Sequence, residues 1–442
     1  MIKKFAACLI LATVCTAKDA NPRLEQVIQS YVSSHQFMGS VLVARGEEIV
    51  LSRGYGSANL EWDIPNSPAT KFRLGSITKQ FTAACILLLE ERAKLRIDDP
   101  VKKYLPDAPT AWDKITIFHV LTHTSGIPSF TDFPDYRESE AASTTPEKLV
   151  ERFRNKPLDF EPGSKWKYSN SGYVLLGYLI EKVSGETYQR FLQENIFTPL
   201  GMKDSGYDSN SEIIRHRAAG YSPGNGGIIN AGFINMTVPF SAGGLYSTTE
   251  DLLRWERGLF GGKVLSAASL QKMTTPFKDN YACGLFVETS NGHKQISHGG
   301  GIEGFNTSLA YWPDEKLSII VLGNLNGGAP GDISNKLGAV MHGEQVTLPS
   351  ERKEITVSPD VLQTYVGTYE LVPGVDMTIT LEGSQLMTQL TGQPKFPLYA
   401  QSKTLFFLKV VDAQVEFSKD ASGKVTQATL HQNGRDTVAR KK

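Results

Sequence analysis

The sequence contains little cysteine and no excess of charge of either sign. Lysine plus arginine and aspartate plus glutamate number 46 each, so the charge balance gives no reason to expect nucleic acid as a partner. Of the four cysteines, Cys8 and Cys15 lie near the N-terminus. Cys85 and Cys283 are far apart and lack the spacing of a metal site, and the sequence leaves open whether both thiols are free.

Long hydrophobic runs are also absent. After the N-terminus, no segment is long and apolar enough to span a bilayer. Residues 1–17 combine Lys3 and Lys4 with a short apolar core and small residues, which is the pattern of a secretory signal peptide cleaved near Ala17, or after Ala20. We therefore expect a secreted or periplasmic mature chain without a transmembrane segment.

Motifs of several common enzyme classes are missing. No Gly-x-Ser-x-Gly sequence occurs, which counts against an ordinary α/β-hydrolase. The glycine-rich stretch 323–328 lacks the lysine and serine of a phosphate-binding loop. His119 and His123 are four residues apart, but no carboxylate lies between them and no third ligand is visible, so we expect both to pack structurally. We therefore expect neither a metal nor a cofactor.

The hydrophobic patterns divide the rest of the chain into two units. Within residues 24–343, strand patterns near 40–52 and 284–322 flank a helix-rich middle, which predicts one sheet built from both chain ends with a helical lobe inserted. Residues 344–358 are polar and contain Pro349, as expected of a linker. Residues 359–442 show short alternating strands and tight turns, which predict a small all-β sandwich or barrel.

One serine has an unusual setting. Ser76 lies three residues before Lys79 at the start of an apolar helix, so the two side chains share one helix face. A serine hydroxyl needs a base to become nucleophilic, and a nearby amine can serve. The apolar run 81–89 predicts a buried helix, and loss of water would lower the pKa of Lys79 towards neutrality. The other serines with lysine at the third following position lie in turns or mixed, polar segments: Ser164, Ser269 and Ser350.

Two further clusters follow in order along the chain. Tyr168 and Asn170 form a Tyr-Ser-Asn sequence, and His298 precedes three glycines. Each residue also has a simpler structural explanation, as a helix cap for Ser76, a core aromatic, a turn residue or a loop histidine. The occurrence of all three clusters in one chain favours a serine hydrolase that does not use a Ser-His-Asp triad.

These clusters carry a family resemblance. The chain resembles the penicillin-recognising serine hydrolases, on the class C β-lactamase and D,D-carboxypeptidase side, over about residues 24–340. The segments that carry it are 72–79, 121–128, 161–163 with 168–170, 242–245 and 298–300. The resemblance implies an α+β fold with an antiparallel sheet and a helical lobe. The C-terminal unit more weakly resembles the lipocalin-like all-β domain appended to some members.

The resemblance also implies catalytic roles. Ser76 would be the acylated nucleophile, Lys79 would share its proton, and Tyr168 would act as general base and then acid. A free phenol has a pKa of about 10, so Tyr168 would need a nearby cation such as Lys79 to shift it. Asn170 would hold the substrate amide and orient Lys79.

The third cluster would bind substrate. The backbone N–H groups of Ser76 and Gly301 would form the oxyanion hole. Glycines including Gly300 would let substrate backbone lie close along a strand. His298 stands where typical β-lactamases have lysine, and histidine is only partly charged near neutral pH. This difference disfavours β-lactams, favours peptide or ester substrates and suggests that His298 helps to set a pH optimum.

The resulting interpretation is an exported serine hydrolase that works through an acyl-enzyme. We expect a D-amino-acid-specific peptidase or amidase of the D,D-carboxypeptidase or D-aminopeptidase type, with a small-molecule or peptide substrate. An esterase or β-lactamase of the same fold is an alternative. A non-catalytic penicillin-binding or sensor protein is an alternative from another class. Substrate pockets would depend on loops 128–146 and 222–238, whose shapes the sequence does not determine, and the oligomeric state stays open.

Overall fold

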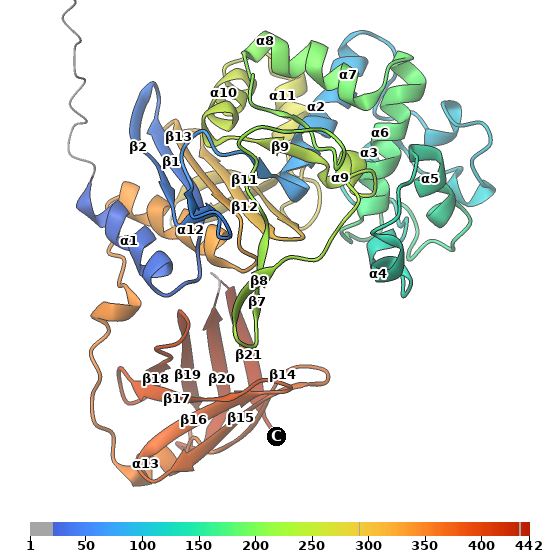
Figure 1. Cartoon of the computed structure of the whole chain (residues 1–442). Helices are drawn as coiled ribbons and strands as arrows, with labels where there is room; N and C mark the ends of the chain where they lie inside the picture. Colours follow the sequence, from blue (N-terminus) through green and yellow to red (C-terminus); the bar gives the residue numbers. More distant parts are fainter. Residues whose placement is uncertain (1–20, 291, 433–434) are drawn as a thin grey trace, which may run out of the picture.

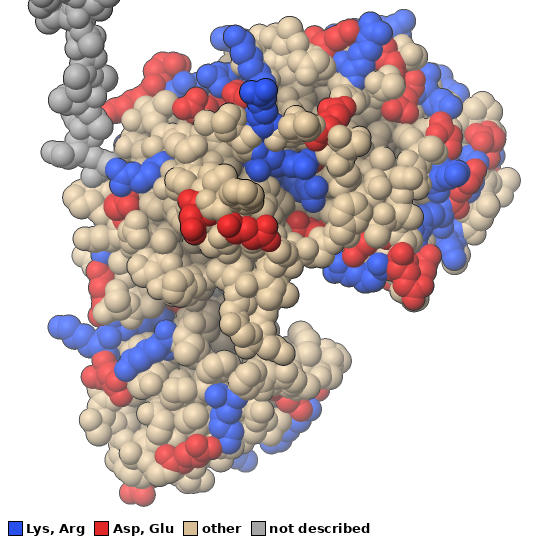
Figure 2. All heavy atoms as spheres, in the orientation of Figure 1, with Lys and Arg blue, Asp and Glu red and all other residues tan. Residues whose placement is uncertain are grey.

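The computed structural model describes residues 21–290, 292–432 and 435–442. The predicted signal peptide, residues 1–17, lies outside these described residues, as does part of the C-terminal unit at residues 433–434. None of the helices within them is long and apolar enough to cross a membrane. Basic and acidic side chains are interspersed over the face shown in Figure 2, in keeping with the balanced composition.

The larger unit is built on one antiparallel sheet that joins the two ends of its sequence. The strand order is β10-β11-β12-β13-β1-β2, and β1 lies between β13 and β2. The strands are β1 (Gly39–Arg45), β2 (Glu48–Tyr55), β10 (Phe286–Ser290), β11 (His293–Ile302), β12 (Phe305–Trp312) and β13 (Leu317–Gly323). The predicted sheet of N- and C-terminal strands is therefore confirmed.

Both faces of this sheet are covered. Because successive side chains of a strand point to opposite faces, Leu42 packs into the core of the helical lobe, whereas Val41 and Val43 pack against α1 (Pro22–Ser33) and α12 (Ala329–Met341). Figure 1 shows these two helices on one side of the sheet and the helical lobe on the other. This arrangement explains why β1 and β13 are apolar throughout rather than alternating.

The helical lobe is centred on two buried helices, α2 (Thr78–Glu91) and α6 (Asn170–Ser184). Helix α6 ends at Gly185, whose φ of 78° is a left-handed conformation that glycine adopts at low cost. The other helices of the lobe are α3 (Ile117–Leu121), α4 (Tyr136–Ser139), α5 (Pro146–Arg154), α7 (Tyr188–Leu192), α8 (Thr198–Leu200), α9 (Phe240–Gly243), α10 (Thr249–Phe260) and α11 (Ala267–Thr274).

Three small sheets complete this unit. They comprise β3 (Ser57–Asn59) with β4 (Ile64–Pro65), β5 (Phe72–Arg73) with β9 (Leu245–Ser247) and β6 (Gly206–Tyr207), and β7 (Tyr221–Gly224) with β8 (Gly227–Asn230). Cys85 and Cys283 are both buried free thiols. Burial raises the pKa of each thiol, so both side chains behave as small core residues.

The C-terminal unit is a closed antiparallel barrel, one of the two predicted all-β forms and consistent with a lipocalin-like domain. A short helix, α13 (Pro359–Gln363), precedes it. Its strands are β14 (Gly367–Val372), β15 (Val375–Glu382), β16 (Gln385–Leu390), β17 (Lys395–Ala400), β18 (Leu405–Phe407), β19 (Ala413–Lys419), β20 (Val425–Gln432) and β21 (Arg435–Lys441). Aliphatic and aromatic side chains together form the core of this unit, and the rings of Tyr365 and Phe417 stack with centroids 4.4 Å apart.

Ion pairs connect the two units. Asp412 of the barrel contacts Lys336 of α12 and Arg352, while Arg23 of α1 contacts Glu351. Glu351 and Arg352 belong to the predicted linker, residues 344–358, which contains one 3-10 turn, η6 (Pro349–Glu351). The predicted boundaries of 24–343 and 359–442 stay predictions, because charged contacts alone do not define where a domain begins.

Candidate active site

Ser76 lies on a 3-10 turn, η1 (Gly75–Ile77), that leads directly into α2. Gly75 has φ of +56°, and a Cβ atom at this position would lie 2.8 Å from the backbone nitrogen of Gly301. Only glycine allows the turn to lie this close to β11, in a backbone conformation that other residues rarely adopt. The local sequence therefore places the Ser76 backbone against the strand that carries Gly301.

Lys79 is completely buried and contacts three oxygen atoms. Its Nζ atom lies 2.9 Å from Ser76 Oγ, 2.9 Å from Asn170 Oδ1 and 2.8 Å from the carbonyl oxygen of Ala242. Burial lowers the pKa of Lys79 well below its ordinary value, as the sequence predicted, and none of the three contacts is a carboxylate that would oppose this effect.

The direction of the Lys79–Ser76 hydrogen bond depends on whether the amine is protonated. A neutral amine has two N–H groups and one lone pair. The carbonyl oxygens of Asn170 and Ala242 can only accept, so they take the two N–H groups. The protonated amine also donates to Ser76 Oγ, whereas the lone pair of the neutral amine can accept the Ser76 proton instead. This arrangement is that of a base ready to remove the serine proton.

Tyr168 lies beside this pair. Its ring centroid is 4.8 Å from Lys79 Nζ, and its hydroxyl interacts with Ser76. Burial raises the pKa of Tyr168 above its ordinary value, and the interaction with Ser76 opposes this only in part. The expectation that Lys79 shifts the phenol towards neutrality is therefore wrong, because burial raises the pKa of Tyr168 and lowers that of Lys79.

Asn170 connects the amine to the substrate cavity. Its Oδ1 atom accepts from Lys79, and its Nδ2 atom donates to Thr131 Oγ1 at 3.1 Å. These two bonds fix the orientation of the amide, which is the side chain that begins α6. Ser129 also accepts from the Asn170 backbone N–H at 3.0 Å. The sequence had indicated the contact with Lys79 but not the supporting roles of Ser129 and Thr131.

His298 is buried, and both of its ring nitrogens have partners. Nδ1 lies 2.6 Å from the Gly299 carbonyl oxygen, which can only accept, and Nε2 lies 3.2 Å from the Tyr281 hydroxyl. Burial, followed by the proximity of Lys79, lowers the pKa of His298 to about 3. The expectation of a partly charged His298 that sets a pH optimum is therefore wrong, since the ring is neutral at physiological pH.

A second buried histidine supports the phenol. The ring of His123 lies 4.3 Å from that of Tyr168 and 4.6 Å from that of Tyr281, measured between centroids. Its Nδ1 atom accepts from the Ser169 backbone N–H at 3.2 Å. The predicted packing role of His123 thus has a specific place, beside Tyr168. Tyr281, which contacts both histidines, carried no sequence signal because it belongs to no recognisable motif.

The glycines after His298 serve different purposes. A Cβ atom on Gly300 would lie 1.9 Å from the carbonyl oxygen of Leu74 and 2.3 Å from Thr307 Oγ1, so this glycine allows η1 to approach the strand. Gly301, in contrast, lines the cavity beside Ser76. Close approach of backbone does require Gly300, as predicted, but the backbone that approaches it belongs to the protein rather than to a substrate.

A cavity of about 650 Å³ opens beside Ser76. Asn170 and Gly301 line it, whereas His298 and Gly300 are not among the described lining residues. The two predicted pocket loops do contribute, with Phe130, Thr131, Phe133, Tyr136, Arg137 and Glu140 from the first and Ser222, Gly232 and Ile234 from the second. Sequence reasoning missed the charged lining residues, which are Arg137, Glu140 and Glu303.

The comparisons with known proteins agree with this geometry. The model of the Beta-lactamase family matches residues 24–340. The chain belongs to the beta-lactamase family. In this family member, residues 351–441 match a second model, described as a domain of unknown function, DUF3471.

Relatives match nearly the whole of this beta-lactamase family member. Penicillin-binding protein 4* of Bacillus subtilis is 30% identical over 435 residues, which cover 91% of this chain and 94% of the relative. The octameric penicillin-binding protein homologue from Pyrococcus abyssi is 26% identical with a TM-score of 0.68, covering 95% of this chain and 99% of that one. A D-stereospecific amidohydrolase from Streptomyces sp. is 27% identical with a TM-score of 0.63, and the match covers 74% of this chain and 100% of that one.

Proposed function

We propose that this protein is an exported serine hydrolase that forms an acyl-enzyme on Ser76 and cleaves amide bonds next to D-amino acids. The observation that carries the proposal is the 2.9 Å contact between Lys79 Nζ and Ser76 Oγ, with the amine desolvated and its N–H groups held by two carbonyl oxygens. A buried neutral amine in this position is the base that a serine nucleophile requires.

Acylation follows from this arrangement. Ser76 Oγ attacks the substrate carbonyl carbon while its proton moves to the lone pair of Lys79. The backbone N–H groups of Ser76 and Gly301 stabilise the resulting oxyanion, and one such donor contributes about 10²–10³ in rate. Gly75 is what allows these two N–H groups to approach each other.

Tyr168 completes the first half of the reaction. Because its phenol keeps its proton, it donates to the leaving nitrogen as the C–N bond breaks, and the proton held by Lys79 then replaces the one that it lost. In the second half, water attacks the acyl carbon and gives a proton to the pair formed by Lys79 and Tyr168. Ser76 Oγ then leaves and recovers its proton from this pair, so the enzyme is regenerated.

The charges of the cavity favour one substrate type within this class. Glu140 and Glu303 line the cavity with side chains only 11% and 17% exposed, and they share Arg137, which is 74% exposed. The described lining residues contain no other charged side chain, so the cavity wall has a net negative charge. A D-amino acid amide or N-terminal D-peptide, with its free ammonium group, suits this wall better than a substrate with a terminal carboxylate.

Two alternatives use the same site. An esterase reaction needs the same acyl-enzyme and a better leaving group. A β-lactamase reaction is less favoured, since neutral His298 offers no cation for the carboxylate of a β-lactam. The D-specificity is supported by the relationship to a D-stereospecific amidohydrolase. A non-catalytic binding role is not favoured, because the nucleophile, base and proton donor are all in contact.

The test uses an irreversible fluorophosphonate probe and the full chain. We expect the wild type and the control Ser164→Ala to label, and Ser76→Ala not to label. Ser164 is a suitable control because it is exposed and also precedes a lysine by three residues, but it lies in a turn away from the cavity. Equal labelling of Ser76→Ala and wild type would overturn the assignment. Turnover of D-phenylalanine amide against its L-enantiomer then tests the stereochemistry.

A further inference from the structure

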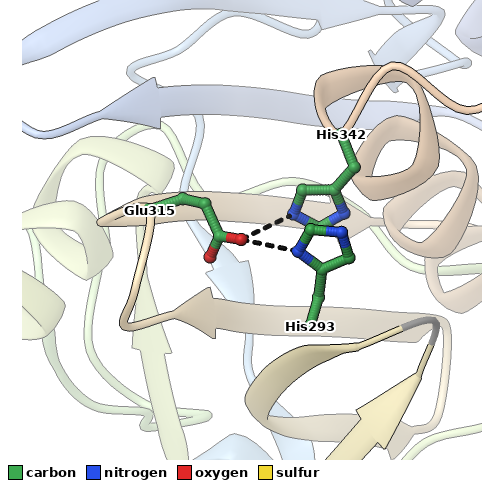
Figure 3. A group of neighbouring side chains, drawn as sticks. All are labelled: His293, Glu315 and His342. Carbon is green, nitrogen blue, oxygen red and sulfur yellow. Dashed lines mark hydrogen bonds and ion pairs between the residues drawn. The ribbon is translucent and has the colours of Figure 1, made fainter.

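We propose that His293, Glu315 and His342 bind a divalent transition-metal ion, of which Zn²⁺ is the best match. His293 begins β11, Glu315 lies in the turn between β12 and β13, and His342 directly follows α12. Figure 3 shows the three side chains meeting from these separate segments. The site is distinct from the catalytic cavity, because His293 lies at the opposite end of β11 from Gly301. It departs from the expectation that the protein needs no metal.

The spacing of the ligand atoms is near that of a metal site. Glu315 Oε1 lies 2.6 Å from His293 Nδ1 and 3.8 Å from His342 Nε2, and all three atoms are within 4.8 Å of one another. Ligands bonded at about 2.0–2.1 Å to a tetrahedral ion are about 3.3 Å apart. The two observed separations lie on either side of this value, so a small rotation of the partly exposed Glu315 side chain would equalise them.

The two imidazole rings stack on each other. They are parallel to within 4°, with centroids 3.7 Å apart, and Figure 3 shows that each turns a nitrogen towards the Glu315 carboxylate. Because an imidazole lone pair lies in the plane of its ring, one ring has to rotate out of the stack when both bind the same ion. Two neutral histidines and one carboxylate are a donor set typical of zinc. Solvent at the exposed side of Glu315 would supply a fourth ligand.

Polar atoms without partners provide an independent reason. The His342 side chain is 5% exposed, yet its Nε2 atom has no hydrogen-bond partner among the described residues. The Oε2 atom of Glu315 is also buried without one. Buried polar atoms are almost always satisfied by protein, water or an ion. A metal ion would satisfy Nε2 directly, and its bound water could reach Oε2.

A bound ion would fasten the sheet to α12 at the point where the chain leaves for the barrel. Because such binding favours only the folded state, it should raise the melting temperature further as the free ion concentration rises above the dissociation constant. The spacing in sequence explains why the site carries no motif. The three residues are 22 and 27 positions apart, and only the β-hairpin and the return of α12 bring them together.

The test measures Zn²⁺ binding to the full chain after treatment with a chelator. Isothermal titration should give one site per chain, and Co²⁺ in its place should give the visible absorption of a tetrahedral ion. We expect His342→Gln and His293→Gln to weaken binding at least tenfold and to remove the thermal shift that Zn²⁺ produces. His293 is partly exposed, so its variant should fold even if His342→Gln does not.

A matched control comes from the barrel. His431 lies between Glu416 and Asp436 but is itself partly exposed on the surface. His431→Gln should bind Zn²⁺ as the wild type does. Binding that is lost in His431→Gln but kept in His293→Gln, or only millimolar binding by every variant, would show an adventitious ion only and overturn the proposal.

Discussion

The start and the middle of β11 place histidines in contrasting surroundings. In the middle of the strand, His298 is enclosed by aromatic rings, and its two nitrogens have Gly299 and Tyr281 as partners. At the N-terminal end, His293 is partly exposed and faces a carboxylate and a second imidazole. Five residues apart on one strand, the same residue type therefore supports a neutral catalytic pocket in one place and a charged, ligand-like cluster in the other.

The comparison teaches that burial, rather than residue type, determines charge in this protein. Lys79, His298 and His123 are all basic residues in name, but desolvation lowers the pKa of each. Burial in this part of the sheet thus favours neutral bases and protonated acids. Among the described lining residues of the cavity, the charged ones are Arg137, Glu140 and Glu303.

The largest expected effect is that of removing the neutral base. Lys79→Ala should lower the rate of acylation by about 10³-fold or more, because general-base assistance contributes about 10²–10⁴-fold and no other lysine among the described residues is buried. The measurement is the labelling rate with a fluorophosphonate, with the melting temperature as a check of folding. The control is Lys167→Ala, an exposed lysine paired with Asp159. Retained acylation would remove Lys79 from the mechanism.

The next effect separates the acid role of Tyr168 from a base role. Tyr168→Phe should lower turnover of an amide by about 10²-fold but affect a p-nitrophenyl ester much less, since only the poor leaving group needs a proton. Both kcat values are measured on substrates with the same acyl group. Equal losses on the two substrates would instead mean that the phenol acts before the leaving group departs.

A smaller effect is expected at the charged wall of the cavity. Glu303→Gln should reduce kcat/KM for a D-amino acid amide about tenfold and leave its N-acetyl analogue unchanged, because only the free amine is cationic. Arg137→Gln is the matched control, which removes a positive charge from the same wall instead of a negative one. It should not reduce kcat/KM for the D-amino acid amide. If Arg137→Gln instead abolishes activity on a peptide with a free C-terminal carboxylate, the preferred substrate is a carboxypeptidase substrate.

The contrast between the two histidine environments also predicts the response to pH. Because the pKa of His298 is about 3, His298→Gln should change the rate but not the shape of the pH profile between pH 5 and 8. A profile whose acid limb disappears in this variant would show that His298 titrates in that range.

The smallest effect concerns stability at the other end of β11. In the metal-free protein, the folded-state pKa of His342 is below its unfolded value, so the folded state binds fewer protons and stability falls as pH drops below about 6.5. Urea unfolding at pH 7.5 and 5.0 should show this loss, and His342→Phe should reduce it. If the variant loses as much stability between pH 7.5 and 5.0 as the wild type does, other groups dominate acid unfolding.

Part of the candidate site was visible in the sequence because Ser76 and Lys79 lie close together along the chain, whereas Tyr168, Asn170 and His298 were indicated by the family resemblance. Ser76 and Lys79 are one helical turn apart, so their contact is a local consequence of α2. The apolar run after them was enough to predict burial and the lowered pKa of Lys79. The protonation of Tyr168 and His298 was not predictable in the same way, because it depends on rings such as Tyr281 and His123 that arrive from distant segments.

Local pattern therefore indicated the two-unit architecture and the sheet shared by the chain ends, and local spacing together with the family resemblance indicated Ser76 and Lys79 as the candidate nucleophile and its amine. These features rest on periodicity and on short spacings that survive in any compact arrangement of the chain. The tertiary structure decided which groups carry charge, which glycines face protein rather than substrate, and which distant side chains meet. Those properties depend on desolvation and on contacts between segments tens to hundreds of residues apart, which no local pattern encodes.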